Sequence, residues 1–168
     1  EISACRVGSE MCIRDSRIGG LEKDYTTGAL SNDPANHEKM IMTRREKIAR
    51  IADDIPALEV IGPEDADVLL MGWGGTYGHL RTAATELNAQ GKKVAFAQLR
   101  YINPLPANTG EVLSRFGTVI VAELNTGMLA DYLQAKFPKT EIKRINKIQG
   151  QPFLAEEVVE AVNNIIGE

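Results

Sequence analysis

The stretch DVLLMGWGGTYGHLRTAATELNAQGKKVAFAQL, residues 67–99, decides the fold of this chain. Its first part, residues 67–73, is almost continuously apolar, as expected for a strand buried on both faces. Residues 76–90 place apolar side chains on one side of a helix, and Gly91 suits the helix end. Residues 93–99 are again apolar. The order strand, helix, strand predicts a parallel pair joined by a helical crossover.

The same alternation continues on both sides of this stretch. Further strands are predicted at residues 57–61, 118–124 and 141–146, and further helices in a short segment ending at Phe116, at 127–137 and at about 154–166. The polar and apolar residues of 141–146 alternate, which favours a strand near a sheet edge. We therefore expect an α/β fold: a three-layer α/β/α sandwich with a mainly parallel sheet.

Residues 19–56 predict a separate unit, a loop followed by one helix. Asp33 can cap this helix, Pro34 suits its first turn, and Pro56 ends it. His37 lies among charged residues of the helix, so its ring is expected to be exposed. The predicted division is a linker loop and helix at 19–56 and an α/β domain at 57–168.

Composition excludes several functions. The chain has 168 residues, 43% hydrophobic and 25% charged, with a net charge of −4, so neither a nucleic-acid partner nor a membrane segment is expected. No secretory signal is seen, and we expect a cytoplasmic protein. Cys5 and Cys12 are the only cysteines, a weak metal signal. No iron–sulfur cluster can be held by thiolates after Cys12.

The glycine-rich segment GWGGTYG, residues 72–78, stands between a strand and a helix, where phosphate-binding loops lie. It is not the dinucleotide fingerprint, because Tyr77 occupies the place of the third glycine, and no P-loop lysine follows. We expect these glycines to allow a tight turn, with anion binding as the alternative.

Polar residues follow the ends of the predicted parallel strands, which meet at one edge of the sheet. Arg100 can bind a carboxylate or phosphate through its planar fork, or pair across an interface. Asn125 or Thr126 can cap the next helix. The candidates for interface or loop-shaping roles are Gly74, His79, Arg100, Asn103, Glu123 and Asn125.

Five segments, 20–48, 65–78, 99–106, 121–133 and 146–153, occur in an order that resembles a known family. Together they are similar to the C-terminal part of the alpha subunit of 2-oxoacid:ferredoxin oxidoreductases, with the 2-oxoglutarate type nearest.

The resemblance implies a subunit of an enzyme that oxidatively decarboxylates a 2-oxoacid to an acyl-CoA and reduces ferredoxin. It implies thiamine diphosphate, Mg²⁺ and an iron–sulfur cluster, held mainly by a beta subunit, with coenzyme A as substrate. The present region would be the transketolase C-terminal-like domain (core domain II), with 19–56 as the link from a preceding pyrimidine-side domain. No catalytic, cofactor or metal residue carries over, so this part is expected to serve assembly.

Two other interpretations stay open. The chain can be an independent anion- or nucleotide-binding module that uses residues 72–78, or a relative of the pyruvate dehydrogenase beta-type C-terminal domain. The segments RYINPLP, 100–106, and NKIQGQPF, 146–153, favour the ferredoxin-linked family.

The segment VGSEMCIRDS, residues 7–16, is interpreted as having a different origin from the rest of the chain. It resembles the translation of a transposon-end adapter used in sequencing libraries. We expect residues 1–18 to be an assembly artefact joined to a truncated gene. The alternative is a native flexible N-terminus with a reactive Cys12.

Overall fold

The computed structural model describes residues 21–167. The hypothesis on residues 1–18, with Cys5 and Cys12, lies outside these described residues. The described part divides into two units, one ending at Lys47 and the other beginning at Ile48, and each is described by itself.

The first unit holds a loop and most of a helix, whose last residues, from Ile48 on, belong to the second unit. The helix α2 spans Pro34–Arg50, and a single 3-10 turn follows at Ile51–Asp53. Its start is as predicted, because the Asp33 carboxylate accepts hydrogen bonds from the N–H groups of the second and third residues after it, at 3.2 and 3.3 Å. The helix does not reach Pro56. The N–H groups of Asp54 and Ile55 both bond to the Ile51 carbonyl, and this tightening ends the helical ladder.

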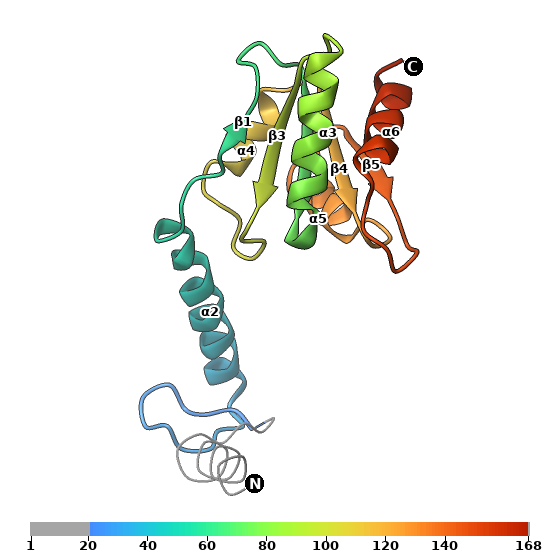
Figure 1. Ribbon diagram of the computed structural model, residues 1–168. Helices are drawn as coiled ribbons and strands as arrows, with labels where there is room; N and C mark the ends of the chain where they lie inside the picture. The colour runs from blue at the N-terminus through green and yellow to red at the C-terminus, as the bar shows by residue number, and fades with distance from the viewer. Residues whose placement is uncertain (1–20, 168) are drawn as a thin grey trace, which may run out of the picture. The chain divides into compact units, whose positions relative to one another are not determined.

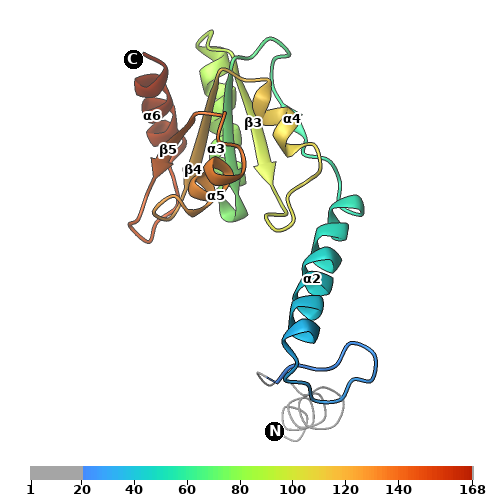
Figure 2. The same ribbon diagram turned by 180° about the vertical axis from the view of Figure 1, so that it is seen from behind.

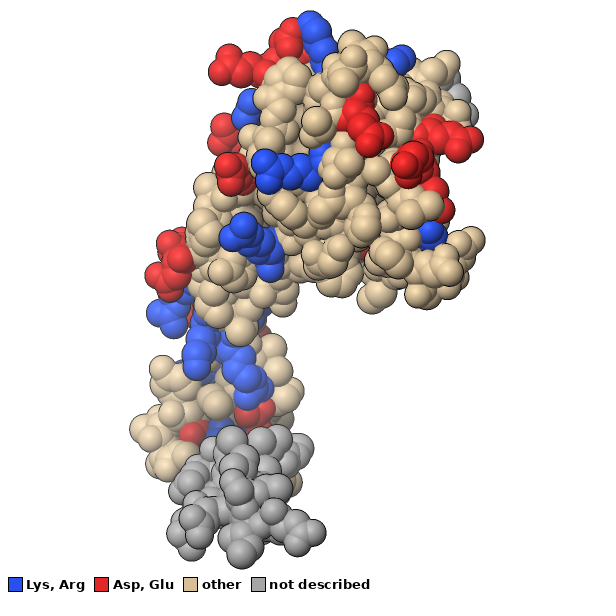
Figure 3. All heavy atoms as spheres, in the orientation of Figure 1, with Lys and Arg blue, Asp and Glu red and all other residues tan. Residues whose placement is uncertain are grey.

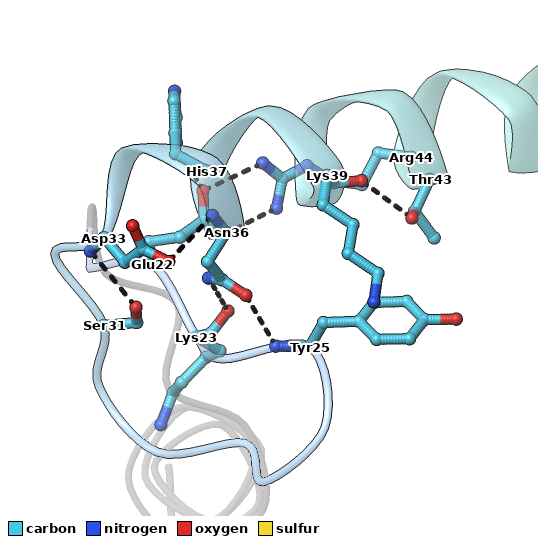
Figure 4. A network of polar contacts seen from close by, with 10 residues as sticks. All are labelled: Glu22, Lys23, Tyr25, Ser31, Asp33, Asn36, His37, Lys39, Thr43 and Arg44. Atoms are coloured by element: carbon cyan, nitrogen blue, oxygen red, sulfur yellow. Dashed lines mark hydrogen bonds and ion pairs between the residues drawn. The ribbon is translucent and has the colours of Figure 1, made fainter.

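The loop before α2 folds back onto the first turns of the helix (Figure 4). Asn36 is buried, and its amide donates to the Lys23 carbonyl at 2.9 Å and accepts from the Tyr25 N–H at 2.9 Å. The Glu22 carboxylate accepts hydrogen bonds from Nη1 and Nη2 of Arg44, at 3.1 and 3.2 Å. It also lies 2.7 Å from His37 Nδ1. His37 is 62% exposed as expected, but sequence reasoning missed its carboxylate partner.

The contacts of Glu22 with Arg44 and His37 predict that the stability of this loop depends on pH. Hydrogen bonds from Arg44 and then His37 lower the pKa of Glu22 from its usual 4.5 to about 2. A lowered pKa stabilises the folded loop fully above pH 4.5, and this contribution is lost as the pH falls through about 2. We expect the NMR shift of the Tyr25 amide to move towards its disordered value only at the acid end of that window. In Glu22→Gln the shift should be displaced already at neutral pH, and an unchanged shift would contradict this assignment.

The second unit contains a five-stranded sheet in the order β1-β3-β2-β4-β5 (Figure 1). The strands are β1 Val60–Ile61, β2 Val68–Trp73, β3 Val94–Leu99, β4 Thr118–Glu123 and β5 Ile142–Asn146. The pairs of β2 with β3, β2 with β4, and β4 with β5 are parallel, and β1 alone pairs antiparallel. The strand predicted at 57–61 is only two residues long, Val60–Ile61. The strand predicted at 141–146 lies at the edge of the sheet, as expected.

Two layers of helices cover the sheet. The helices are α3 Tyr77–Ala89, α4 Thr109–Ser114, α5 Met128–Lys136 and α6 Ala155–Gly167. The helices α3 and α6 pack on one face (Figure 1), and α4 and α5 pack on the other (Figure 2). The central apolar runs of β2, β3 and β4 are buried between them, as predicted. The predicted three-layer α/β/α sandwich is confirmed.

The carboxyl ends of β2, β3, β4 and β5 lie at one edge of the sheet, because these strands are parallel. After β2 the chain enters α3 on one face, and after the neighbouring β4 it enters α5 on the other. Chain segments that part in this way leave a crevice, which is the usual ligand position in open α/β sheets. Within residues 21–167, no helix is both long and apolar enough to span a bilayer.

Candidate functional site

A hollow of about 220 Å³ lies between the ends of β2 and β4, lined by Trp73, residues 74–76, Leu124 and Asn125. Glu123 is buried next to it. This residue ends β4 and has no exposed surface. Its carboxylate accepts four hydrogen bonds: from the N–H groups of Leu129 and Ala130 at 2.8 and 3.0 Å, from Trp73 Nε1 at 3.1 Å and from the Asn125 amide at 3.1 Å. All four partners are N–H donors, and two of them belong to the first turn of α5, where a carboxylate interacts favourably with the helix N-terminus. Glu123 therefore joins β2, β4 and α5.

Asn125 continues this network. Its side-chain oxygen accepts from the N–H groups of Gly127 and Met128 at 2.7 and 3.0 Å, which holds the turn before α5. The N-cap of α5 is Gly127, so the prediction of Asn125 or Thr126 as the N-cap is wrong. Gly127 has a φ of +102°, so α5 begins at Met128, one residue later than predicted. Glu123 and Asn125 shape this turn together.

The glycine-rich segment is a tight, self-contained turn. Gly74 has a φ of +59°, which favours glycine, and its carbonyl accepts from the Gln98 amide at 3.1 Å. The Thr76 hydroxyl lies 3.2 Å from the Trp73 N–H and 2.9 Å from the Trp73 carbonyl. At Gly72 a Cβ would lie 2.3 Å from Leu80 Cδ1, so this glycine allows α3 to pack on β2. These contacts support the tight-turn interpretation.

Arg100 lies apart from the Glu123 network, directly after β3. It is exposed and has no hydrogen bond or ion pair with any described residue. It lines two adjoining hollows, of about 540 and 150 Å³, and shares both with Tyr77 and Gln98. Trp73 and Ile102 form further walls of the larger hollow.

The remaining two candidates are placed differently. Asn103 is exposed and precedes Pro104 through a cis peptide bond. His79 lies in the first turn of α3, partly exposed, and makes no hydrogen bond with the described residues. The structure thus brings Glu123 and Asn125 into one network, and leaves Arg100, Asn103 and His79 outside it.

Sequence reasoning missed the role of Trp73, and it assigned Gly72 to the tight turn without foreseeing its close contact with Leu80. Trp73 ends β2 and donates to Glu123, fifty positions away in sequence. The available signal was the position of both residues at the end of an apolar run. The buried Glu123 carboxylate on β4 requires hydrogen-bond donors, and Trp73 on β2 supplies one. The strand order that makes β2 and β4 neighbours cannot be predicted from the local sequence pattern.

The described residues contain no cluster of metal ligands. No group of three or more His, Cys, Asp or Glu side chains within residues 21–167 is arranged to hold a metal ion. The one buried carboxylate, Glu123, already has four donors. What the edge offers chemically is an unpaired guanidinium beside an aromatic hollow.

Comparison with known proteins identifies the family. The pyruvate:ferredoxin oxidoreductase core domain II matches residues 66–158. The chain belongs to this family. Among curated relatives, this core domain II chain is 44% identical over 145 residues to a 2-oxoglutarate oxidoreductase subunit, KorA, of Mycobacterium tuberculosis, covering 86% of the chain and 22% of that relative. It is 33% identical over 166 residues to a 2-oxoacid:ferredoxin oxidoreductase subunit alpha of Aeropyrum pernix, covering 96% and 25%.

Solved structures agree with the core domain II assignment. One match is a 2-oxoglutarate:ferredoxin oxidoreductase from Magnetococcus marinus with 2-oxoglutarate, coenzyme A and succinyl-CoA bound. The TM-score is 0.79 and the sequence identity 34%, and the match covers 88% of the present chain and 26% of the Magnetococcus marinus chain. A split-gene transketolase matches with a TM-score of 0.50 and 20% identity, over 65% and 41%, which shows a shared fold. The chain spans about a quarter of the length of the two curated relatives.

Proposed function

We propose that the chain is part of the alpha subunit of a 2-oxoglutarate:ferredoxin oxidoreductase. The complete enzyme would convert 2-oxoglutarate and coenzyme A to succinyl-CoA and CO2, with the electrons passing to ferredoxin. The carrying observation is the 44% identity with a 2-oxoglutarate oxidoreductase subunit. The Magnetococcus marinus structure, which holds 2-oxoglutarate and coenzyme A, supports it over 88% of the chain.

Within that enzyme, this part serves assembly. Its described residues offer no metal-ligand cluster, and its buried carboxylate caps a helix. As the family resemblance implies, thiamine diphosphate, Mg²⁺ and the iron–sulfur cluster would be held by other parts of the enzyme, mainly the beta subunit. Residues 19–56 would be the link from a preceding domain, and 57–168 the transketolase C-terminal-like domain. The enzyme would be cytoplasmic, with no nucleic-acid or membrane partner.

Turnover tests this function. The complete alpha and beta subunits should reduce methyl viologen when given 2-oxoglutarate and coenzyme A, and the 168-residue chain alone should not. Because a site that pairs a second carboxylate rejects a substrate without one, kcat/KM for 2-oxoglutarate should exceed that for pyruvate by at least about tenfold. A preference for pyruvate would refute the substrate, and turnover by the chain alone would refute the assembly role.

The hollow beside Arg100 favours a second candidate, an anion- or nucleotide-binding module. Its volume of about 540 Å³ and its Trp73 and Tyr77 walls suit a planar ring, with Arg100 near an attached phosphate. Raised thermal stability of the chain in millimolar ADP, absent in Arg100→Ala, would support it.

A further inference from the structure

Exposed apolar side chains of the α/β unit gather at one edge. Apart from Ile48 and Ile51, which lie on α2 and in the turn after it, six large hydrophobic side chains of the described part of this unit are exposed, at 37–68% of their surface. All six stand on or next to the segments that leave the carboxyl ends of β2 to β5: Tyr77, Tyr101, Leu124, Met128, Ile148 and Leu154. Scattered exposed apolar residues need no explanation, but six restricted to one edge indicate a contact surface.

Charge has the opposite distribution. The connections at the amino edge, 62–67, 90–93, 115–117 and 137–141, carry these charged residues: Glu64, Asp65, Asp67, Lys92, Lys93, Arg115, Lys139 and Glu141. The segment 54–59, which enters the antiparallel β1 at the carboxyl edge, carries Asp54 and Glu59, and the four connections that follow the parallel strands, 74–76, 100–108, 124–127 and 147–154, carry only Arg100 and Lys147. In Figure 3 the lower border of the α/β unit, where the strands end, is correspondingly mostly tan.

One of these two charges is already neutralised. Lys147 Nζ contacts the Glu157 carboxylate at 2.6 Å and the Pro152 carbonyl at 2.9 Å, and its side chain is only 10% exposed. Arg100 is left without a partner among the described residues. Protein interfaces have this composition at their centre: few charges, aromatic and Met side chains, and an arginine in a hollow.

We propose that this carboxyl edge, formed by its four connections with Tyr77 and Met128, binds the beta subunit. The occupant is a surface of apolar side chains around one carboxylate, and that carboxylate enters the hollow and pairs with Arg100. The choice of a partner subunit rests on the proposed function and on the names of the relatives, which are subunits of larger enzymes.

The four connections that follow the parallel strands supply no free carboxylate, since Glu123 is fully buried. A second copy of the chain docked edge to edge would therefore bring no free carboxylate from these segments to Arg100. Glu59, exposed on the segment that enters β1 at this same edge, lines the smaller hollow together with Arg100. It is the carboxylate that this chain or a second copy offers to Arg100, and it enters the test as Glu59→Gln.

The experiment measures association of the complete alpha subunit with the complete beta subunit. Arg100→Glu should raise the dissociation constant at least about tenfold, because like charges would face each other in the contact. Ile148→Asp should weaken binding similarly by placing a charge in the apolar surface. Arg115→Glu is the matched control, the same change at the amino edge, and Glu59→Gln tests internal pairing. Both should stay within about twofold.

Hydrogen exchange identifies the occupant. Peptides covering 100–108 and 147–154 should exchange fast in the isolated alpha subunit and slowly in the alpha–beta complex. Slow exchange already in the isolated subunit would assign the edge to the rest of the alpha chain and overturn the proposal, as would a dimer of that subunit broken by Arg100→Glu. Equal effects of Arg100→Glu and Arg115→Glu would also overturn it. These readouts need no substrate, so a wrong 2-oxoacid would change the turnover result alone.

Discussion

Glu123→Leu is expected to lower the free energy of unfolding of the α/β unit by about 3–5 kcal/mol. Leucine has nearly the same volume but accepts no hydrogen bond. The substitution would leave four donors without an acceptor: the N–H groups of Leu129 and Ala130, Trp73 Nε1 and the Asn125 amide. Two of these donors belong to residues that are buried, so water cannot readily replace the carboxylate.

Equilibrium unfolding of the chain in urea measures this change, with Trp73, the single tryptophan, as the fluorescent reporter beside the site. Glu160→Leu is the matched control, because Glu160 is exposed on α6, and it should change stability by no more than about 0.5 kcal/mol. Glu123→Gln should fall between the two, since it keeps one acceptor oxygen. Equal stabilities of Glu123→Leu and Glu160→Leu would show that the four contacts contribute nothing.

Sequence pattern predicted the layers of this fold well. The strands β2, β3 and β4 are buried on both faces, so each required an apolar run, and each was recognised by one. The prediction was less accurate at the ends of strands and helices, where few contacts determine which residues belong to the element. The strand at 57–61 shrank to two residues that pair antiparallel with β3, a direction that its side chains do not encode.

The candidate site was predicted only in part, because its contacts are not local. The side-chain oxygen of Asn125 binds N–H groups two and three residues away, which are local contacts within the turn before α5. The contact of Glu123 with Trp73 joins residues fifty positions apart, and that of Glu22 with Arg44 joins residues 22 apart. Sequence reasoning found Glu123 by its place at a strand end, but its complete burial follows from the order of the strands.

Gly72→Ala is expected to destabilise the α/β unit by about 1–3 kcal/mol through overpacking. The new Cβ would lie 2.3 Å from Leu80 Cδ1 and 2.4 Å from Thr76 Oγ1. Neither neighbour can move away easily. Leu80 has no exposed surface, and the Thr76 hydroxyl is held against the Trp73 backbone. Urea unfolding of the chain measures the loss.

Two neighbouring glycines provide matched controls, because a Cβ at Gly75 or Gly78 would meet no atom within 4 Å. Gly78→Ala lies in the first turn of α3 and should stabilise the unit, by up to about 1 kcal/mol, since alanine favours helix. If Gly72→Ala behaved like Gly78→Ala, packing would not explain the glycine at 72. Opposite signs at positions six residues apart would show that Gly72 is required by the packing of α3 on β2, and that a phosphate ligand is not needed to account for it.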